Sequence, residues 1–230
     1  MLIYGKNVVL EALHAKRKFN KLYVDTKMKD VTFLSIIKKF DVEITHRSKE
    51  QLHNLVLHSN HQGVVADVED YKVYALEDLL KEEVSKLIVL DSIEDPHNLG
   101  AIIRTAAAAG IDGIVMSLKQ QVPINATVAK VSSGGIEHVK IAITPQLFKG
   151  LDDIKQAGFE IVGTDMRADT SFKDKVYKEK TAIVMGNEGS GLRPLVKKKC
   201  DAFVKIPMKG HMDSLNVSVA AALLMYEMTK

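Results

Sequence analysis

Cysteine is scarce in this sequence of 230 residues, where Cys200 is the only one. A single cysteine cannot form an internal disulfide, so the chain is suited to a reducing compartment. Free cysteines are usually buried as small hydrophobic residues, and we expect this of Cys200 rather than a role as a nucleophile. The fold must therefore depend on its hydrophobic core, which a chain of this length can form in one or two domains.

Long apolar runs are also missing. The two most apolar stretches, residues 101–111 and 217–228, are shorter than the roughly 20 helical residues that cross a bilayer. The first residues lack the basic start and the apolar run of a signal peptide. The sequence shows no internal repeat and no low-complexity tract. These absences predict a soluble, cytoplasmic protein.

Neither sign of charge is in large excess, because 32 lysines and arginines accompany 29 acidic residues. A net charge of +3 is weak support for a nucleic-acid partner. Basic residues cluster at 16–18 and 197–199, but solvated helix faces explain such clusters at least as well.

The order of apolar and polar segments divides the chain into two units. Residues 1–70 alternate between expected helices and strands, which predicts a small α/β unit with a largely parallel sheet. Its helices are expected at 5–14, 31–40 and 49–57, and its strands at 22–25, 42–45 and 63–68. The charged stretch 71–86 is the candidate linker, with room for a short helix at 76–80.

Residues 87–230 form the second unit, in which nearly continuous apolar strands alternate with helices. Such strands are typical of a parallel sheet that helices cover on both faces. The strands are expected at 87–91, 113–116, 139–143, 160–164, 181–185 and 203–206, and the last helix at 216–228. Because ligands of such sheets bind outside the carboxyl ends of the strands, the loops that follow the strands are the candidate sites.

Two of these loops follow the strands expected at 87–91 and 181–185. The loop 91–100 leads into a helix that we expect to start at the N-cap Asn98 and to end before Gly110. Arg104 is the only charged side chain in that helix, and it is either an ordinary surface residue or an active-site cation. The loop 185–192 has three glycines, which allow close approach to a ligand.

The glycine-rich loop lacks both the GxGxxG pattern and the lysine of a phosphate-binding loop, and Glu188 would repel phosphate. A non-phosphorylated ligand or an RNA hydroxyl fits it better. A third loop, 206–218, starts where Pro207 ends a strand, and Ser214 or Asn216 is expected to cap the next helix. Each loop alone is also compatible with a plain connection between a strand and a helix.

Together, the three loops resemble the motifs of the SpoU (TrmH-like) class of RNA 2′-O-methyltransferases in order and spacing. The matching residues are Asn98-x-Gly100-x-x-x-Arg104, Gly186-Asn187-Glu188-Gly189-x-Gly191, and Ile206-Pro207-Met208 followed by Ser214-Leu215-Asn216-Val217-Ser218. The first unit is similar to the L30e-like RNA substrate-binding domain of bacterial members. That similarity rests on Tyr4-Gly5-x-Asn7-x-Val9-x-Glu11-Ala12-Leu13 and His61-Gln62-Gly63.

The resemblance implies an α/β fold whose C-terminal unit is a trefoil-knot (SPOUT) methyltransferase domain that binds S-adenosylmethionine. The implied cofactor-binding residues are Thr164, Met185, Gly186, Ile206, Met208 and Leu215. The resemblance also implies a homodimer that packs through the last helix and the first motif. The subgroup that the chain resembles most methylates the ribose 2′-hydroxyl of a guanosine in 23S rRNA.

The implied reaction needs side chains that activate a ribose 2′-hydroxyl, which is a poor nucleophile at neutral pH. Arg104 can favour the alkoxide that develops during transfer, but arginine stays protonated in proteins and is a poor base. Glu188 would orient Arg104 or accept the proton. Asn98 and Asn216 would orient the ribose, the loops or each other, and Ser214 is a further candidate for this role. The methyl donor is already activated, so we expect no metal.

Four histidines lie close together in the first unit, namely His46, His53, His58 and His61. Their spacing matches no structural zinc site and no cysteine is nearby, so we do not expect them to bind a metal. His61 is instead expected to touch RNA or to cap the last strand of the unit. The candidate RNA contacts are Lys6, Asn7, His61 and Gln62.

Two other functions remain open. A tRNA guanosine 2′-O-methyltransferase would use the same chemistry, although such enzymes generally carry other extensions than an L30e-like unit. A non-catalytic RNA-binding protein of ribosome assembly would keep the fold without turnover, although the intact motif residues argue against this. A Rossmann-type methyltransferase is disfavoured because no D/E-x-G-x-G loop follows the first strand of either unit.

Overall fold

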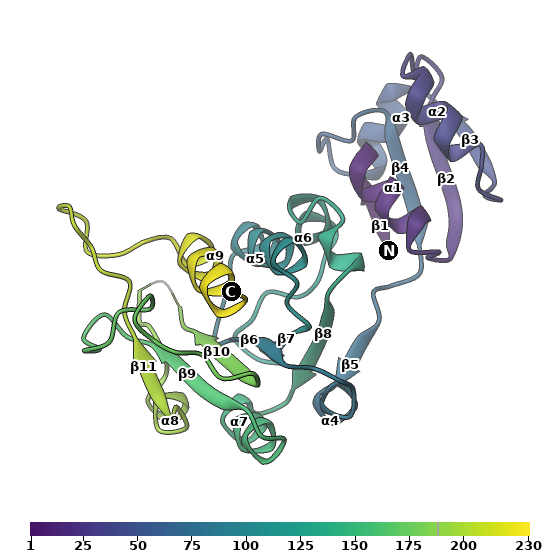
Figure 1. The fold of residues 1–230 in the computed structure, drawn as a ribbon. Coiled ribbons are helices and arrows are strands. Elements are labelled where there is room, and N and C mark those ends of the chain that lie inside the picture. The colour runs from purple at the N-terminus through teal and green to yellow at the C-terminus, as the bar shows by residue number, and fades with distance from the viewer. Residues whose placement is uncertain (188) are drawn as a thin grey trace.

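The computed structural model describes residues 1–187 and 189–230, which fold around two sheets. A small N-terminal unit carries a sheet of four strands, and a larger unit carries a sheet of seven (Figure 1). Only the short extended segment 69–72 connects the two sheets. Among the described residues, no helix has the length and apolar character needed to span a membrane.

The small unit has a mixed sheet in the order β1-β4-β2-β3. Its elements are β1 (Leu2–Tyr4), α1 (Lys6–His14), β2 (Phe19–Asp25), α2 (Val31–Ile37), β3 (Ile44–Arg47), α3 (Lys49–Leu55) and β4 (Val64–Val68). Strand β4 is antiparallel to both β1 and β2, and only β2 and β3 are parallel. The prediction of a largely parallel sheet is therefore wrong for this unit. After α3 the chain returns so that β4 lies between β1 and β2 and runs antiparallel to both.

The larger unit has a sheet in the order β11-β9-β10-β6-β7-β8-β5, and all of its strand pairs are parallel. Its strands are β5 (Val73–Ala75), β6 (Lys86–Leu90), β7 (Gly113–Ser117), β8 (Lys140–Thr144), β9 (Glu160–Thr164), β10 (Thr181–Met185) and β11 (Ala202–Val204). Its helices are α4 (Leu76–Leu80), α5 (Pro96–Ala109), α6 (Ala126–Val131), α7 (Leu147–Gln156), α8 (Pro194–Lys197) and α9 (Val217–Met228), with a 3₁₀ turn η1 (Gly135–Glu137). This arrangement confirms the predicted parallel sheet.

Strand β5 and helix α4 lie within the stretch that was expected to be a linker. Strand β5 pairs with β8 at the edge of the larger sheet, and Leu76 and Leu79 of α4 are buried beneath that sheet. With three residues and an exposed Val73, β5 is too short to show the alternation of a strand in the sequence. Residues 73–80 thus belong structurally to the larger unit.

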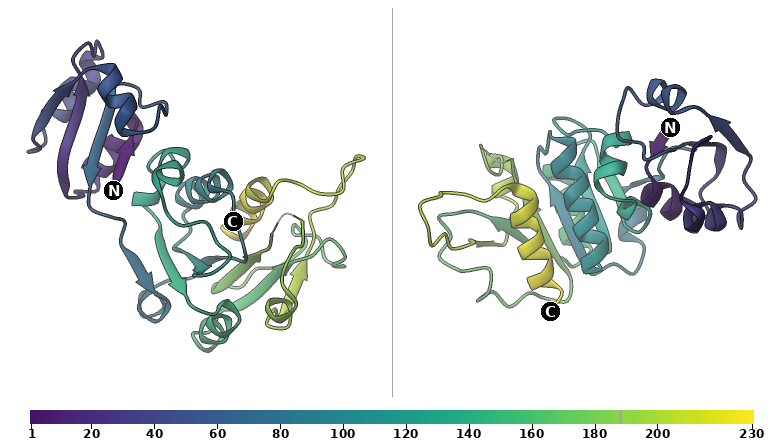
Figure 2. Two further views of the ribbon diagram at one scale, coloured as in Figure 1. Left: turned by 180° about the vertical axis from the view of Figure 1, so that it is seen from behind. Right: turned by 90° about the horizontal axis from the view of Figure 1, so that it is seen from above.

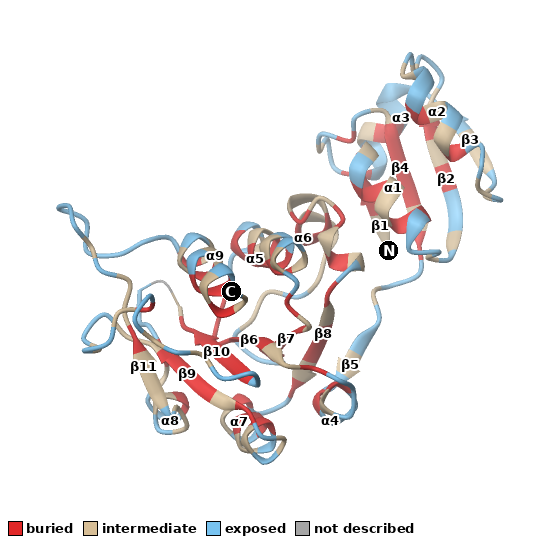
Figure 3. Ribbon diagram, in the orientation of Figure 1, coloured by how far each residue is buried: buried red, intermediate tan, exposed pale blue. Residues whose placement is uncertain are grey.

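Helices cover both faces of the larger sheet, and its central strands are almost wholly buried (Figure 3). One face packs against α5, α6 and α9, and the other against α4, α7 and α8. Helices α5 and α9 lie side by side on the first face (Figure 2). Cys200 is half-buried against the second face, where burial raises the pKa of its thiol to about 12, so the thiol stays protonated at neutral pH.

An ion pair fixes the small unit against the larger one. Arg17, after α1, donates to the carboxylate of Glu137 in η1 at 2.8 Å, and both side chains are 8% exposed. The guanidinium also lies over the ring of Tyr71, 3.4 Å from its centroid. Burial raises the pKa of Glu137 above its ordinary value. The contact therefore buries two opposite charges, one from each unit, where the units meet.

Candidate active site

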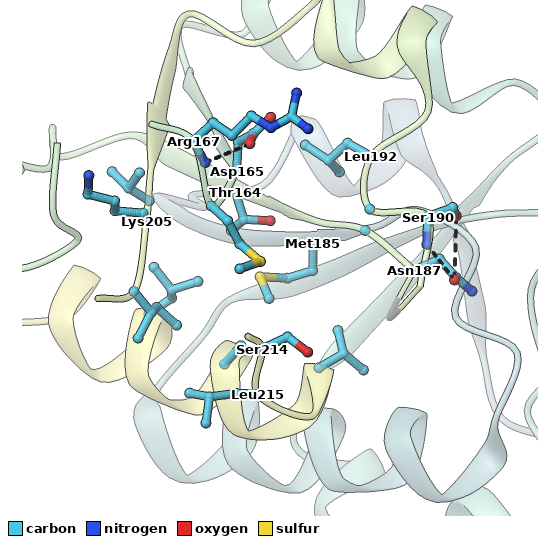
Figure 4. Close-up of a pocket in the computed structure, with 18 of the residues that line it drawn as sticks. Thr164, Asp165, Arg167, Met185, Asn187, Ser190, Leu192, Lys205, Ser214 and Leu215 are labelled. Carbon is cyan, nitrogen blue, oxygen red and sulfur yellow. Dashed lines mark hydrogen bonds between the residues drawn. The ribbon is translucent and has the colours of Figure 1, made fainter. Parts of the chain in front are cut away.

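A cavity of about 410 Å³ opens at the carboxyl ends of β9, β10 and β11 (Figure 4). It is bordered by the loops that follow these strands and by the first turns of α9. The carboxyl ends of neighbouring parallel strands are where ligands of such sheets bind. The location matches the prediction made from the second and third loops.

The cavity brings together residues that lie far apart in the chain. Seven predicted site residues line it, namely Thr164, Met185, Gly186, Ile206, Met208, Ser214 and Leu215. Met185 is buried at the end of β10, and the hydroxyl of Thr164, at the end of β9, donates to the carbonyl of Val184 at 3.2 Å. Apolar side chains of α9, including Val217 and Leu224, form another part of the wall. The cavity thus has apolar side chains in its wall and main-chain groups of the loops at its border.

The glycine-rich loop folds back on itself beside the cavity. The backbone of Asn187 exchanges hydrogen bonds with that of Gly191, at 3.2 and 2.9 Å. A Cβ atom on Gly186 would lie 2.3 Å from the carbonyl carbon of Gly191, so only glycine fits there. Gly191 itself has a φ of 66°, in the left-handed region that favours glycine. Glu188, the predicted partner of Arg104, lies outside the described residues.

Polar contacts from another strand brace this loop. The amide of Asn187 donates to the carbonyl of Ser92 at 3.1 Å, and its oxygen accepts from the N–H of Gly189 at 3.0 Å. Arg193, at the end of the loop, donates from Nε to Asp91 at 2.6 Å and from its backbone N–H at 2.9 Å. Asp91 is fully buried at the end of β6.

One signal could have pointed to Asp91, because a carboxylate directly after a buried strand needs a partner. Its partner Arg193 lies 102 residues later, which no local pattern reveals. We therefore missed both residues in the sequence, although together they anchor the end of the glycine-rich loop.

Charged groups gather at one side of the cavity. Lys197 donates to Asp165 at 2.7 Å, and this hydrogen bond, with one from the N–H of Arg167, holds the pKa of that carboxyl below its ordinary value. Arg167 and Lys205 also line the cavity (Figure 4). The cavity thus offers both signs of charge beside its apolar lining.

Asn98 and Asn216 form a direct hydrogen bond between α5 and α9. The amide nitrogen of Asn216 donates to Oδ1 of Asn98 at 2.9 Å, and Asn98 is only 8% exposed. Asn216 also caps α9, accepting from the N–H of Ser218 at 2.9 Å. The pair therefore orients the loop that ends at α9, one of the roles expected for it. The prediction that Asn98 is the N-cap of α5 is wrong, because Asp95 accepts from the N–H of His97 and Pro96 occupies the first turn.

Arg104 lies on α5 outside the cavity, with its side chain exposed. No hydrogen bond or ion pair joins it to another residue in the part of the chain that the structure describes. Its Cα packs closely on Gly135 of η1, where an added Cβ would lie 3.1 Å away. The described residues of one copy therefore do not bring Arg104, Asn98 or Asn216 into the lining of the cavity.

Three of the four expected RNA contacts lie together in the small unit. Lys6, His61 and Gln62 line a second cavity, whereas Asn7 lies outside that lining, on the exposed side of α1. The Nδ1 atom of His61 accepts from the N–H of Gly63 at 2.9 Å, so His61 does cap the turn before β4. Within the described ranges 1–187 and 189–230, no group of histidine, cysteine and acidic residues is placed to hold a metal ion.

Known proteins resemble the chain along almost its whole length. Residues 85–226 match the SpoU rRNA Methylase family, and residues 2–74 match the family of RNA 2′-O ribose methyltransferase substrate-binding domains. YacO of Bacillus subtilis, assigned to the TrmH family of tRNA/rRNA methyltransferases, is 41% identical over 233 residues, covering 98% of this chain and 93% of that protein.

Two crystal structures share the fold. That of the SpoU methyltransferase AviRb from Streptomyces viridochromogenes in complex with AdoMet superposes with a TM-score of 0.83 at 24% identity, covering 100% of this chain and 89% of that one. One described as an RNA 2′-O ribose methyltransferase has a TM-score of 0.81 at 26% identity, with coverages of 99% and 87%. The similarity extends through both units.

Proposed function

Because the chain belongs to the SpoU family of RNA ribose 2′-O-methyltransferases, we propose that it methylates the 2′-hydroxyl of a guanosine in 23S rRNA. The methyl donor is S-adenosylmethionine, and the proposal includes a knot in which the C-terminal segment threads through a loop of the chain. The observation that carries the proposal is the cavity at the ends of β9, β10 and β11, which gathers residues of the second and third motifs. The reaction would take place in the cytoplasm, where rRNA is made and assembled.

The cavity fits S-adenosylmethionine in its chemistry. An added Cβ on Gly191 would meet no atom within 4 Å, so the main chain borders open space there, where the adenine would bind. Met185, Leu215 and Leu224 offer the apolar contacts that a purine requires. Asp165 and Arg167 would receive the amino and carboxylate groups at the other end. When bound, S-adenosylmethionine supplies a methyl group that its sulfonium has already activated.

The residues of the chain must then deal with the proton of the ribose hydroxyl. We assign Arg104 to stabilising the developing alkoxide, because a fixed guanidinium favours the negative charge without accepting a proton. Glu188 orients Arg104 or accepts the proton. The Asn98–Asn216 hydrogen bond and Ser214 hold the loop beside the cavity in the conformation that the ribose needs.

A second copy of the chain is part of the proposal. Helix α9 is apolar on all sides, which is typical of a buried helix. Its outward face nevertheless exposes Val219, Leu223 and Tyr226, at 48%, 40% and 53%. A homodimer through α9 would bury this face and would place the neighbouring Arg104 at the contact.

Light scattering tests the dimer. The wild-type protein should have twice the mass of one chain, and the Leu223→Glu variant should have the mass of a single chain. A monomeric wild-type protein would refute the dimer.

The direct test supplies S-adenosylmethionine with a labelled methyl group to the purified protein together with 23S rRNA or tRNA transcripts. Nuclease digestion then identifies the labelled nucleoside. Label in 2′-O-methylguanosine from 23S rRNA would support the proposal. Label in tRNA alone would replace rRNA by tRNA as the substrate, and the absence of label from every RNA would favour the non-catalytic alternative.

A further inference from the structure

The small unit has a cavity of about 660 Å³ that the methyl-transfer reaction does not use. It lies between the start of α1, the loop after β2, helix α3 and the loop before β4. Its lining includes three histidines and four lysines. A cavity of this size can hold a nucleotide, since small-molecule sites range from about 300 to 1,000 Å³.

Three imidazoles form the aromatic part of the lining. The ring of His53 is stacked on that of His58, with centroids 5.6 Å apart, and meets the ring of His61 edge-on at 4.5 Å. His61 is 2% exposed, and its Nδ1 accepts from Gly63, so Nε2 carries the hydrogen. Among the described residues, nothing accepts from this buried Nε2–H. A buried donor without an acceptor is costly, and a bound ligand can supply the acceptor.

The rim of the cavity carries the positive charge. Lys27, Lys29 and Lys49 are exposed, and none of them forms an ion pair with another residue of the described chain. Lys6 differs, because its ammonium group donates to Asp30 at 2.6 Å. Burial, followed by the nearby His53, holds the pKa of His61 below its ordinary value, so its imidazole is neutral at neutral pH. The cavity therefore combines an aromatic surface with a cationic rim.

Aromatic rings beside lysines without ion-pair partners suit single-stranded nucleic acid, whose bases stack on rings and whose phosphates contact cations. A phosphate ion alone would use the lysines and leave the imidazoles without a role. We propose that this cavity binds one unstacked nucleotide of the RNA, with its base against His53, His58 and His61 and its phosphates at the lysines. This proposal depends on the proposed function only for the identity of the RNA that binds.

The position of the cavity relative to the larger unit is fixed. The side-chain oxygen of Gln62 accepts from the N–H of Lys6 at 3.1 Å and from the ammonium of Lys130 at 3.2 Å. Lys130 belongs to α6, which packs against α5, the helix that carries Arg104. The oxygen of Gln62, which is also an expected RNA contact, connects the loop of His61 to the larger unit. A nucleotide held in the cavity would therefore sit at a set place relative to α5.

The test measures binding of the full-length protein to a fluorescently labelled, unstructured RNA of twelve nucleotides, by anisotropy at several salt concentrations. Lys27→Gln with Lys49→Gln should weaken binding about tenfold and lower the salt slope by about 2, one for each lost phosphate contact. The matched control, Lys38→Gln with Lys39→Gln, changes two exposed lysines of the same unit outside the cavity. It should leave affinity within about twofold, as expected for surface charges that contact no phosphate. An equal loss of RNA affinity in both double variants would refute the proposed site.

A second measurement separates a base from a phosphate. His58→Ala removes an exposed ring and keeps the buried ring of His61, and it should weaken binding of the RNA about tenfold, within the range for one lost stacking contact. The NMR signals of His53, His58 and His61 should shift when the RNA is added and stay in place with inorganic phosphate. Equal shifts with phosphate, or unchanged RNA affinity in His58→Ala, would refute the nucleotide site.

Methyl transfer distinguishes the failure of this inference from that of the proposed function. With an active wild-type enzyme, the Lys27→Gln, Lys49→Gln pair should raise KM for RNA and leave kcat unchanged, because the cavity holds RNA and takes no part in the chemistry. An equal fall of kcat would overturn this division of roles. A wild-type protein that binds the RNA at the cavity yet transfers no methyl group would refute only the proposed function.

Discussion

The two units build their cavities from different parts of the chain. In the larger unit, main-chain loops at the ends of parallel strands form the wall, and glycines such as Gly186 let the loops pack closely. In the small unit, lysine and histidine side chains on a mixed sheet form the cavity. A site made of backbone should be sensitive to a single methyl group, whereas a site made of long side chains should respond to lost charge or a lost ring. The following predictions test this difference, from the largest expected effect to the smallest.

Arg104→Ala should abolish methyl transfer, reducing kcat by about a thousandfold or more, as for the loss of a group that stabilises transition-state charge. Affinity for S-adenosylmethionine should change by no more than a few-fold, because Arg104 does not line the cavity of the larger unit. Single-turnover transfer and calorimetric binding measure the two effects. Full activity in this variant would contradict the assigned role, and Arg104→Lys shows how much of the effect needs the guanidinium rather than charge alone.

Gly186→Ala should damage the backbone-built cavity with one methyl group. The new Cβ would lie 2.3 Å from the backbone of Gly191, so the glycine-rich loop must move. We expect the affinity for S-adenosylmethionine to fall at least tenfold, measured by calorimetry, because binding is sensitive to small displacements of a preformed site. The control is Gly210→Ala in the neighbouring loop, where an added Cβ meets no atom within 4 Å. Similar affinities in the two variants would show that the loop is not part of the site.

Arg17→Met tests the contact between the units. It leaves Glu137 buried without its partner, so the free energy of unfolding should fall by about 3 kcal/mol, as for a broken buried ion pair. Urea unfolding measures this change. Lys18→Met is the control, because its ion pair with Glu69 is exposed and should contribute less than about 1 kcal/mol. Equal effects of the two substitutions would mean that the buried pair does not hold the units together.

His61 should make the stability of the small unit depend on pH. Its folded pKa lies below its ordinary value, so between the two values the unfolded chain binds more protons. The free energy of unfolding should therefore fall as the pH drops below about 6.5, the ordinary value for histidine. The groups that act on it are His53, Asp25, Lys49 and Lys130. Urea titrations between pH 7.5 and 5 should show a shallower fall in His61→Gln; identical profiles would refute this assignment.

The parallel sheet was predictable because its strands are buried on both faces. The strands at Glu160–Thr164 and Thr181–Met185 have the predicted bounds, since unbroken apolar runs between polar turns mark them. Strands β1 and β5 were missed, because three residues cannot display a period. The direction of β4 was also unpredictable, since a helix between two strands does not fix how they pair.

The site was predictable where loops follow strands and not where partners are distant. Many residues that line the cavity of the larger unit come from the second and third motifs, which follow strands. The Asp91–Arg193 pair and the contact of Gln62 with Lys130 join residues 102 and 68 positions apart, and no local pattern announces them. His53 and His58 were considered only as a metal site that their spacing disfavoured, because the contact of their rings depends on how the chain turns after α3.

The most direct test of the central claim is a map of 2′-O-methyl groups on rRNA from cells with and without this protein. The account predicts that one guanosine of 23S rRNA loses its methyl group when the protein is absent and regains it with the wild-type chain. It also predicts that Arg104→Ala does not restore the methyl group. A 23S rRNA methylation pattern that is identical in both kinds of cell would contradict the claim.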